Sequence, residues 1–177
     1  MINLVTKRLL IRNARTHDTS YLYWIRESLF VQRFNAMRPL SYDEYAKEID
    51  GSLTDDQQLV IEQKDRMRPI GVIHWGPDHL RYASNSIVIS YWIGQEYARQ
   101  GYMSEALKTV IDYLFSRPDV DVIVARVFSE NVPSLRLVEK LGFIREGMLR
   151  HAVKGYGGKI FDDTLFSILK SDWKTGK

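Results

Sequence analysis

One short segment combines a glycine with the start of a helix, an arrangement that suits the binding of an anion. Residues 100–104 read Gln-Gly-Tyr-Met-Ser and lead into the clearest helical stripe of the chain. Gly101 lets the backbone come close to a ligand, and the first amides of a helix have no partner within it. The helix dipole favours negative charge there, and Arg99 adds a cation. The segment predicts a phosphate site, although one glycine before a helix is also a common cap.

A second segment, Asn131-Val132-Pro133-Ser134, opens another predicted helix. Asparagine is a good N-cap and proline fits the first turn, so a structural role is sufficient to explain these residues when they are considered alone. Their position favours a functional role as well, because they follow the Gly101 turn by one strand-helix-strand unit. The two helix starts together predict one site.

The elements that must position this site follow from the hydrophobic pattern. Apolar residues at steps of three and four predict helices after 16–18, after the capping box at 41–44, over 103–115 and over 131–141. Short apolar or alternating runs predict about seven strands. They cover residues 8–12, 59–61, 70–75, 86–93, 120–127, 143–148 and 164–169.

The run from 120 to 127 is almost continuously apolar, as in a strand that is covered on both faces. A strand, a helix and a buried strand form a right-handed crossover, so residues 86–128 predict a parallel pair. Runs 59–61 and 70–75 predict one hairpin, and runs 143–148 and 164–169 predict another. We therefore expect an α/β (α+β) fold with a mixed, mostly antiparallel sheet, a central parallel pair and helices on both faces.

Bulk properties limit the possible functions. The 177 residues carry a formal net charge of +3 and no cysteine, which excludes disulfides, thiolate metal sites and a cysteine nucleophile. No metal site is predicted. The basic residues are scattered rather than clustered, so a nucleic-acid partner is not favoured. No signal peptide or membrane-spanning run is present, and we expect a single soluble domain over 1–177 in the cytoplasm.

Four segments together resemble the GCN5-related N-acetyltransferases (GNAT), in particular their RimJ/RimL-like branch. They are Thr6-Lys7-Arg8-Leu9-Leu10-Ile11-Arg12, the stretch from Tyr91-Trp92-Ile93 to Glu105-Ala106, the run 131–143, and Phe161-Asp162 through Leu169. The third segment, Asn-Val-Pro-Ser-Leu-Arg-Leu-Val-Glu-Lys-Leu-Gly-Phe, is the most specific. The resemblance covers almost the whole chain and implies the GNAT fold.

The resemblance also implies roles for individual residues. The strand edge at Tyr91, Trp92 and Ile93 would splay from the next parallel strand and bind the pantetheine arm of acetyl-CoA, with a backbone amide near the thioester carbonyl. Asn131 would contact the same arm, and Ser134 would hydrogen-bond the sulfur and help to protonate the leaving thiolate. The pyrophosphate would lie on the backbone amides of Arg99, Gln100, Gly101, Tyr102, Met103 and Ser104.

The chain departs from the family pattern at three positions. Ala98 stands where Gln or Arg is usual, and Met103 stands where Gly or Ala is usual, but the backbone amides survive both changes. Val88 stands where many relatives have a glutamate. His74 is therefore our first candidate for the base, because a histidine has a pKa of about 6.5. Glu96, His151, Asp162, a water relay or a neutral amine remain alternatives.

We thus expect direct transfer of an acetyl group from acetyl-CoA to a primary amine in a ternary complex. The acceptor would be a protein N-terminus or a small molecule, with no membrane partner, and the protein would be a monomer or homodimer. Two other hypotheses remain: a catalytically silent protein that binds CoA or a partner on this scaffold, motivated by Val88 and Met103, and an RNA- or ribosome-binding domain, motivated by the basic charge.

Overall fold

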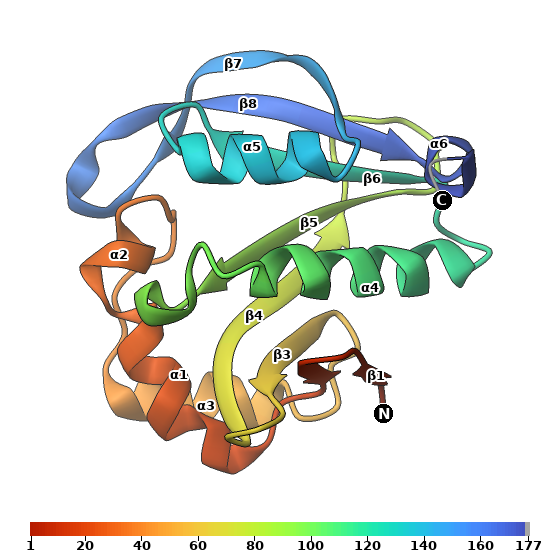
Figure 1. The fold of residues 1–177 in the computed structure, drawn as a ribbon. Helices are drawn as coiled ribbons and strands as arrows, with labels where there is room; N and C mark the ends of the chain where they lie inside the picture. Colours follow the sequence, from red (N-terminus) through yellow and green to blue (C-terminus); the bar gives the residue numbers. More distant parts are fainter. Residues whose placement is uncertain (176–177) are drawn as a thin grey trace.

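The computed structural model describes residues 1–175, without the side chains of Tyr156, Lys174 and Thr175. Over these residues it contains an eight-stranded sheet with the strand order β1-β2-β3-β4-β5-β6-β8-β7 (Figure 1). Among the described strands, only β5 and β6 pair in parallel. The strands are β1 Asn3–Val5, β2 Leu9–Arg12, β3 Gln58–Gln63, β4 Arg68–Pro77, β5 Ser86–Ile93, β6 Val122–Phe128, β7 Ile144–Lys154 and β8 Ile160–Leu169.

Six α-helices and three short 3-10 helices connect these strands over the described range. The α-helices are α1 Thr19–Arg26, α2 Leu29–Gln32, α3 Tyr42–Gly51, α4 Tyr102–Ser116, α5 Val132–Lys140 and α6 Lys170–Thr175. The 3-10 helices are η1 Thr16–Asp18, η2 Gln95–Tyr97 and η3 Tyr156–Gly158. No described helix is both long and apolar enough to cross a membrane.

Helices cover both faces of the sheet, as the sequence predicts. The alternation of side chains along each strand separates two apolar clusters. On one face, the buried stripe of α4 and Val138 of α5 pack against residues such as Ile73 and Ile123. On the other face, Leu22 of α1 and Ile49 of α3 pack on β3 and β4. Each fully buried aliphatic side chain contributes about 1.5–3 kcal/mol of transfer free energy.

The predicted crossover is confirmed. Helix α4 connects β5 to β6, and these strands pair in parallel from Ser86↔Val122 to Ile89↔Ala125. The sequence predicts about seven strands; the eighth is β1, a three-residue strand that pairs antiparallel with β2. Three residues give too little alternation to identify a strand.

In the N-terminal region, capping serines set where helices α2 and α3 begin. Leu29 continues the spacing of α1, but it opens α2 and is exposed. The break occurs because the Ser28 hydroxyl accepts a hydrogen bond from the Val31 amide and starts a new helix. The predicted capping box of α3 is confirmed, since Ser41 and Glu44 each accept a bond from the other's backbone amide.

Candidate active site

The backbone before α4 adopts the form expected of an anion cradle. Gly101 is the N-cap of α4 and has a φ of 81°, which glycine adopts without steric cost. Arg99 has a φ of 61°, and left-handed backbone at a residue with a side chain costs about 1–2 kcal/mol. Among the described residues, no side chain caps the first turn of α4. Strained backbone that leaves amides free is typical of ligand sites.

Strands β5 and β6 separate beyond Ile89, and this opens a gap in the sheet. Their paired register ends at Ile89↔Ala125, whereas β5 continues beside β4 to Ile93. The Gly94 amide donates to the Ile70 carbonyl, which fixes the alternation of that antiparallel pair. By this alternation, the amides and carbonyls of Tyr91 and Ile93 face the gap, and those of Trp92 face β4. The gap therefore has a free strand edge.

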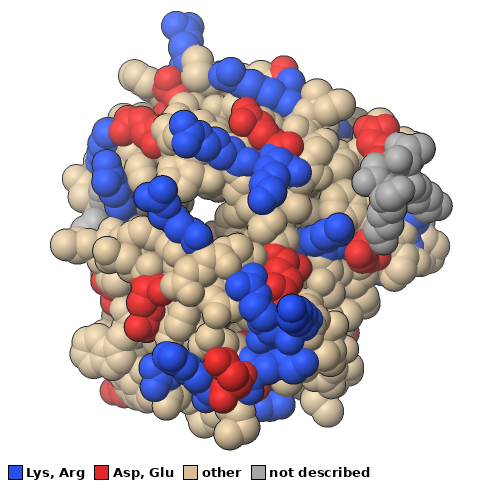
Figure 2. Space-filling model, in the orientation of Figure 1, with Lys and Arg blue, Asp and Glu red and all other residues tan. Residues whose placement is uncertain are grey.

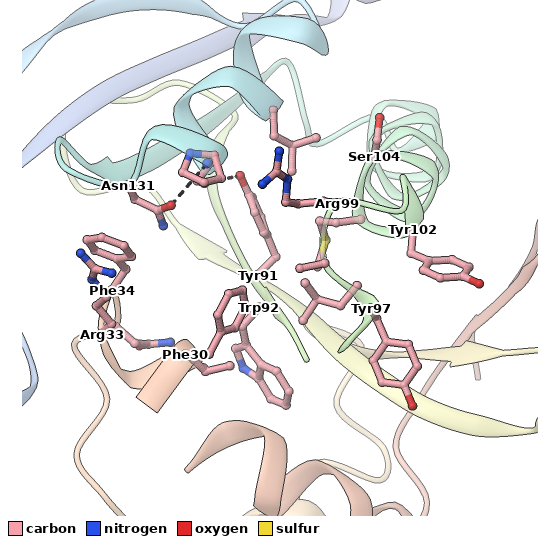
Figure 3. A pocket seen from close by; sticks show the side chains of 18 of the residues that line it. Phe30, Arg33, Phe34, Tyr91, Trp92, Tyr97, Arg99, Tyr102, Ser104 and Asn131 are labelled. Atoms are coloured by element: carbon pink, nitrogen blue, oxygen red, sulfur yellow. Dashed lines mark hydrogen bonds between the residues drawn. The ribbon is translucent and has the colours of Figure 1, made fainter. Parts of the chain in front are cut away.

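Helix α5 begins at this gap with Asn131 as its N-cap. The Asn131 Oδ1 atom accepts a hydrogen bond of 3.3 Å from the Ser134 amide. The Ser134 hydroxyl lies 2.7 Å from the Tyr91 hydroxyl, which reaches toward α5 from β5 (Figure 3). Burial raises the pKa of Tyr91 to about 12, so its phenol stays neutral at ordinary pH. A neutral phenol can donate to Ser134.

A pocket of ≈ 600 Å³ lies between the Gly101 turn and the start of α5. It contains most of the predicted cofactor residues, and its cationic lining residues are Arg33, Arg99 and Lys140. Figure 2 shows an opening in this region, with Lys and Arg side chains gathered around it. The predicted residues that line this pocket are Tyr91, Trp92, Ile93, Arg99, Gly101, Tyr102, Met103, Ser104, Asn131 and Ser134.

Two predicted cofactor residues direct their side chains elsewhere. Gln100 does not line the pocket, and its amide donates to the Glu96 carbonyl at 2.6 Å. The Tyr102 ring turns away from the pocket (Figure 3), and its hydroxyl accepts a hydrogen bond from Gln63 at 2.9 Å. At positions 100 and 102 only the backbone is available to a ligand. The replacement of the usual family residues by Ala98 and Met103 also favours binding through the backbone.

A second pocket, of ≈ 520 Å³, adjoins the first through the gap. Its polar lining includes His74, Ser90 and the Arg126–Asp163 ion pair, whose atoms are 2.7 Å apart. The two pockets share six lining residues: Phe34, Asn35, Tyr91, Trp92, Asn131 and Ser134. A donor in one pocket and an acceptor in the other would meet at this shared wall.

His74 is the predicted base that lies in this second pocket. The ring is exposed to the pocket, yet desolvation by the surrounding protein lowers its pKa, and the nearby Asp55 only partly opposes this. A lowered pKa keeps the imidazole neutral and able to accept a proton at neutral pH. Ser90, on the neighbouring strand, is its partner in register.

The alternative bases are placed less favourably. Glu96 lines neither pocket. Asp162 accepts a hydrogen bond of 2.7 Å from the His151 amide, which joins β8 to β7. His151 itself has a φ of 51° and lines neither pocket. Val88 provides no ionisable group, so His74 is the best placed of the proposed side-chain bases.

The sequence pattern does not reveal three features of the site. Tyr91 fits an alternating strand, but nothing local shows that its hydroxyl meets Ser134, 43 residues away. The Arg126–Asp163 pair joins the neighbouring strands β6 and β8, which are far apart in sequence, and its only local signal is a charged side chain in each strand. Arg33 lines the first pocket from the segment after α2 and has no motif around it.

Comparison with known proteins places this geometry in a family. The model of the acetyltransferase (GNAT) domain matches residues 8–144. An uncharacterised N-acetyltransferase, p20 of Bacillus licheniformis, is 27% identical over 98% of this chain and 99% of its own length. The match therefore extends over both proteins almost completely.

Solved structures share the fold at lower identity. RimL, a ribosomal L7/L12 α-N-protein acetyltransferase in complex with coenzyme A, has a TM-score of 0.82 at 18% identity, with 95% of this chain and 98% of that chain covered. Spermidine N-acetyltransferase from Vibrio cholerae, with CoA and spermine, has a TM-score of 0.80 at 21% identity, with coverage of 96% and 99%. The mixed sheet, the parallel β5–β6 pair and the matching domain model agree, and the chain belongs to the GNAT family of acetyltransferases.

Proposed function

We propose that this chain transfers an acetyl group from acetyl-CoA to a primary amine by direct attack in a ternary complex. The observation that carries the proposal is the meeting of two pockets at Tyr91, Trp92, Asn131 and Ser134. A donor bound on one side of the sheet and an amine bound on the other would bring their reacting atoms together in the gap. The family and its CoA-bound members support the choice of donor.

The residues present fit acetyl-CoA. The free β5 edge at Tyr91 and Ile93 can hydrogen-bond an extended amide chain such as pantetheine, as a neighbouring strand would. The α4 amides after Gly101 suit a pyrophosphate. Arg33 and Arg99 add positive charge to the same pocket. When bound, acetyl-CoA supplies an activated acyl carbon and a thiolate leaving group.

The side chains of the gap can move the two protons that the reaction requires. His74 would accept a proton from the ammonium form of the acceptor, because only the neutral amine has the lone pair that forms the new C–N bond. As the C–S bond breaks, the second proton of the attacking nitrogen would pass to the leaving sulfur, and Ser134 would donate a hydrogen bond to that sulfur and assist its protonation. Tyr91 would donate to Ser134 and orient its hydroxyl toward the sulfur. A gap-facing backbone amide would stabilise the oxyanion.

The acceptor is the second half of the proposal. We propose a protein N-terminus or a small-molecule amine, since structural neighbours include enzymes named for each. The second pocket combines the aromatic residues Phe34 and Phe128 with the Arg126–Asp163 pair, which leaves room for a small group rather than a large folded surface. We also propose that residues 1–177 form a single cytoplasmic domain.

The test is thiol release from acetyl-CoA with a panel of amines and N-terminal peptides, together with calorimetric binding of CoA. We expect release that depends on the added amine and falls in Ser134→Ala. Binding of CoA without release over the whole panel would support the silent-scaffold alternative instead. Binding of RNA that weakens as salt rises would support the third hypothesis, because phosphate contacts are salt-dependent.

A further inference from the structure

The turn between β1 and β2 holds the beginning of α4 through one carboxylate. Glu105, in the first turn of α4, accepts hydrogen bonds from the Thr6 hydroxyl at 2.5 Å and the Arg8 amide at 3.0 Å. The Arg8 Nε atom forms an ion pair of 2.7 Å with the other oxygen of Glu105. Residues almost a hundred positions apart are thus joined directly beside the Gly101 turn.

Arg8 also contacts the cradle itself. Its Nη1 atom donates to the Gln100 carbonyl at 2.9 Å, and its guanidinium lies over the Tyr102 ring, 4.3 Å from the centroid. A Cβ atom added at Gly101 would come within 3.4 Å of the Arg8 Nη2 atom. One side chain therefore contacts the residues on both sides of Gly101.

The position of Glu105 creates an electrostatic problem for an anion site. A carboxylate in the first turn stabilises the helix through its dipole, but it also repels a phosphate bound at the same helix end. Burial alone would raise the pKa of Glu105, but hydrogen bonds from Thr6 and Arg8 outweigh it and lower the pKa. The carboxylate is therefore charged, and Arg8 supplies the compensating cation.

The cradle also needs support because its backbone is strained. Arg99 keeps a φ of 61° although it has a side chain, and such a conformation persists when neighbouring contacts hold it. The contacts of Arg8 with Gln100 and Tyr102 lie at the next positions along the chain. Tyr102 is held a second time by Gln63 of β3.

We propose that Arg8 is a positioning residue for the donor: it cancels the charge of Glu105 and holds residues 99–102 in the form that binds the pyrophosphate of acetyl-CoA. The inference rests on the proposed function, since it takes this pyrophosphate as the guest of the cradle. Neither Arg8 nor Glu105 lines either pocket, so both act through the backbone and the local charge.

The test compares a donor that has the pyrophosphate with one that lacks it. Arg8→Gln, Glu105→Gln and the double variant are assayed with acetyl-CoA and with S-acetylpantetheine, and CoA binding is measured by calorimetry. We expect Arg8→Gln to raise the KM for acetyl-CoA and the Kd for CoA about tenfold, the effect of one uncompensated charge, with kcat retained. The kcat/KM for S-acetylpantetheine should not change.

The double variant should recover most of the lost affinity for CoA, because Glu105→Gln removes the repulsion that Arg8 cancels. The matched control is Arg117→Gln, which breaks the 2.8 Å ion pair with Asp119 beyond the other end of α4. Its side chain is 35% exposed against 39% for Arg8, so both variants remove a partly exposed arginine from an ion pair near an end of α4, although Asp119 is 60% exposed and Glu105 only 22%. The control should bind CoA like the wild type.

The outcomes separate this inference from the proposed function. Equal losses with both donors, or a double variant no better than Arg8→Gln, would show that Arg8 only stabilises the fold and would overturn the inference. An unchanged Kd for CoA in Arg8→Gln would also overturn it. A wild-type protein that binds CoA but acetylates no amine would refute the proposed activity, while the calorimetric comparison would still decide the role of Arg8.

Discussion

Replacing Tyr91 by phenylalanine removes one oxygen from the wall shared by the two pockets. The Tyr91 hydroxyl lies 2.7 Å from the Ser134 hydroxyl, and either atom can be the donor in the free protein. When Ser134 donates its one hydroxyl hydrogen to a sulfur that gains negative charge, its oxygen must be the acceptor in the bond with Tyr91. The two hydroxyls then form a chain in which each bond polarises the next.

The expected magnitudes follow from the kind of bond that is lost. Ser134→Ala removes a hydrogen bond to a charged atom, worth about 1.5–3 kcal/mol, and should lower kcat about 10- to 100-fold. Tyr91→Phe removes a neutral bond of about 0.5–1.5 kcal/mol and should lower kcat about 2- to 10-fold. The phenol stays neutral, since burial raises the pKa of Tyr91 to about 12, so this factor should be constant between about pH 6 and 9.

The assay is a double-mutant cycle on kcat at saturating acetyl-CoA and amine. The double variant should be no slower than Ser134→Ala, because Tyr91 acts only through Ser134. Tyr42→Phe, at an exposed position on α3 that lines neither pocket, is the control and should keep the wild-type kcat. Multiplication of the two single effects in the double variant, or a wild-type kcat in Tyr91→Phe, would refute the coupled hydroxyls.

Three further predictions concern pH and stability. His74→Gln should remove the acid limb of the kcat/KM profile, which in the wild type should lie below the ordinary value of 6.5 because burial lowers the pKa; an unchanged limb would exclude His74 as the base. Arg12→Met removes the buried cation between Asp18 and Glu62 and leaves Glu62 only the more exposed Arg15, at 3.5 Å. It should lower the free energy of unfolding about 3–5 kcal/mol in urea, and a loss under about 1 kcal/mol would contradict this. The raised pKa of Tyr91 stabilises the fold fully below its unfolded value of 10.0, and this stabilisation should be lost as pH rises through about 12; Tyr91→Phe should lose less stability in urea over that range.

The elements next to the site could be predicted because their signals are local. The stripe of α4 and the continuous apolar run of β6 each lie within one segment, and the handedness of the crossover then places them. Gly101 marks its turn because its φ of 81° suits glycine. Capping residues also act over a few positions, which is why Ser41 and Glu44 predict the start of α3. Ser28 carries no such pattern, so the sequence does not show that it separates α2 from α1.

The contacts that complete the site could not be predicted because they join distant residues. The sequence places Arg8 only at the start of a predicted strand, and the fold brings it to Glu105 and the Gln100 carbonyl. The Gln100 side chain donates to the Glu96 carbonyl, a contact that no local pattern predicts, while its backbone amide stays at the predicted cofactor segment. The second hydroxyl beside Ser134 belongs to Tyr91, whose sequence context indicates only a strand. Such pairings depend on register and packing.

The most direct test of the proposed chemistry is a single-turnover mass measurement. The protein is mixed with one equivalent of acetyl-CoA, and protein, amine and thiol are followed by mass spectrometry before and after an acceptor amine is added. We predict that no acetyl group appears on the protein, that CoA is released only once the amine is present, and that the amine gains one acetyl group for each CoA released. Acetylated protein that forms before the amine and then passes its acetyl group on, or CoA release without an acetylated amine, would contradict direct transfer in the gap between β5 and β6.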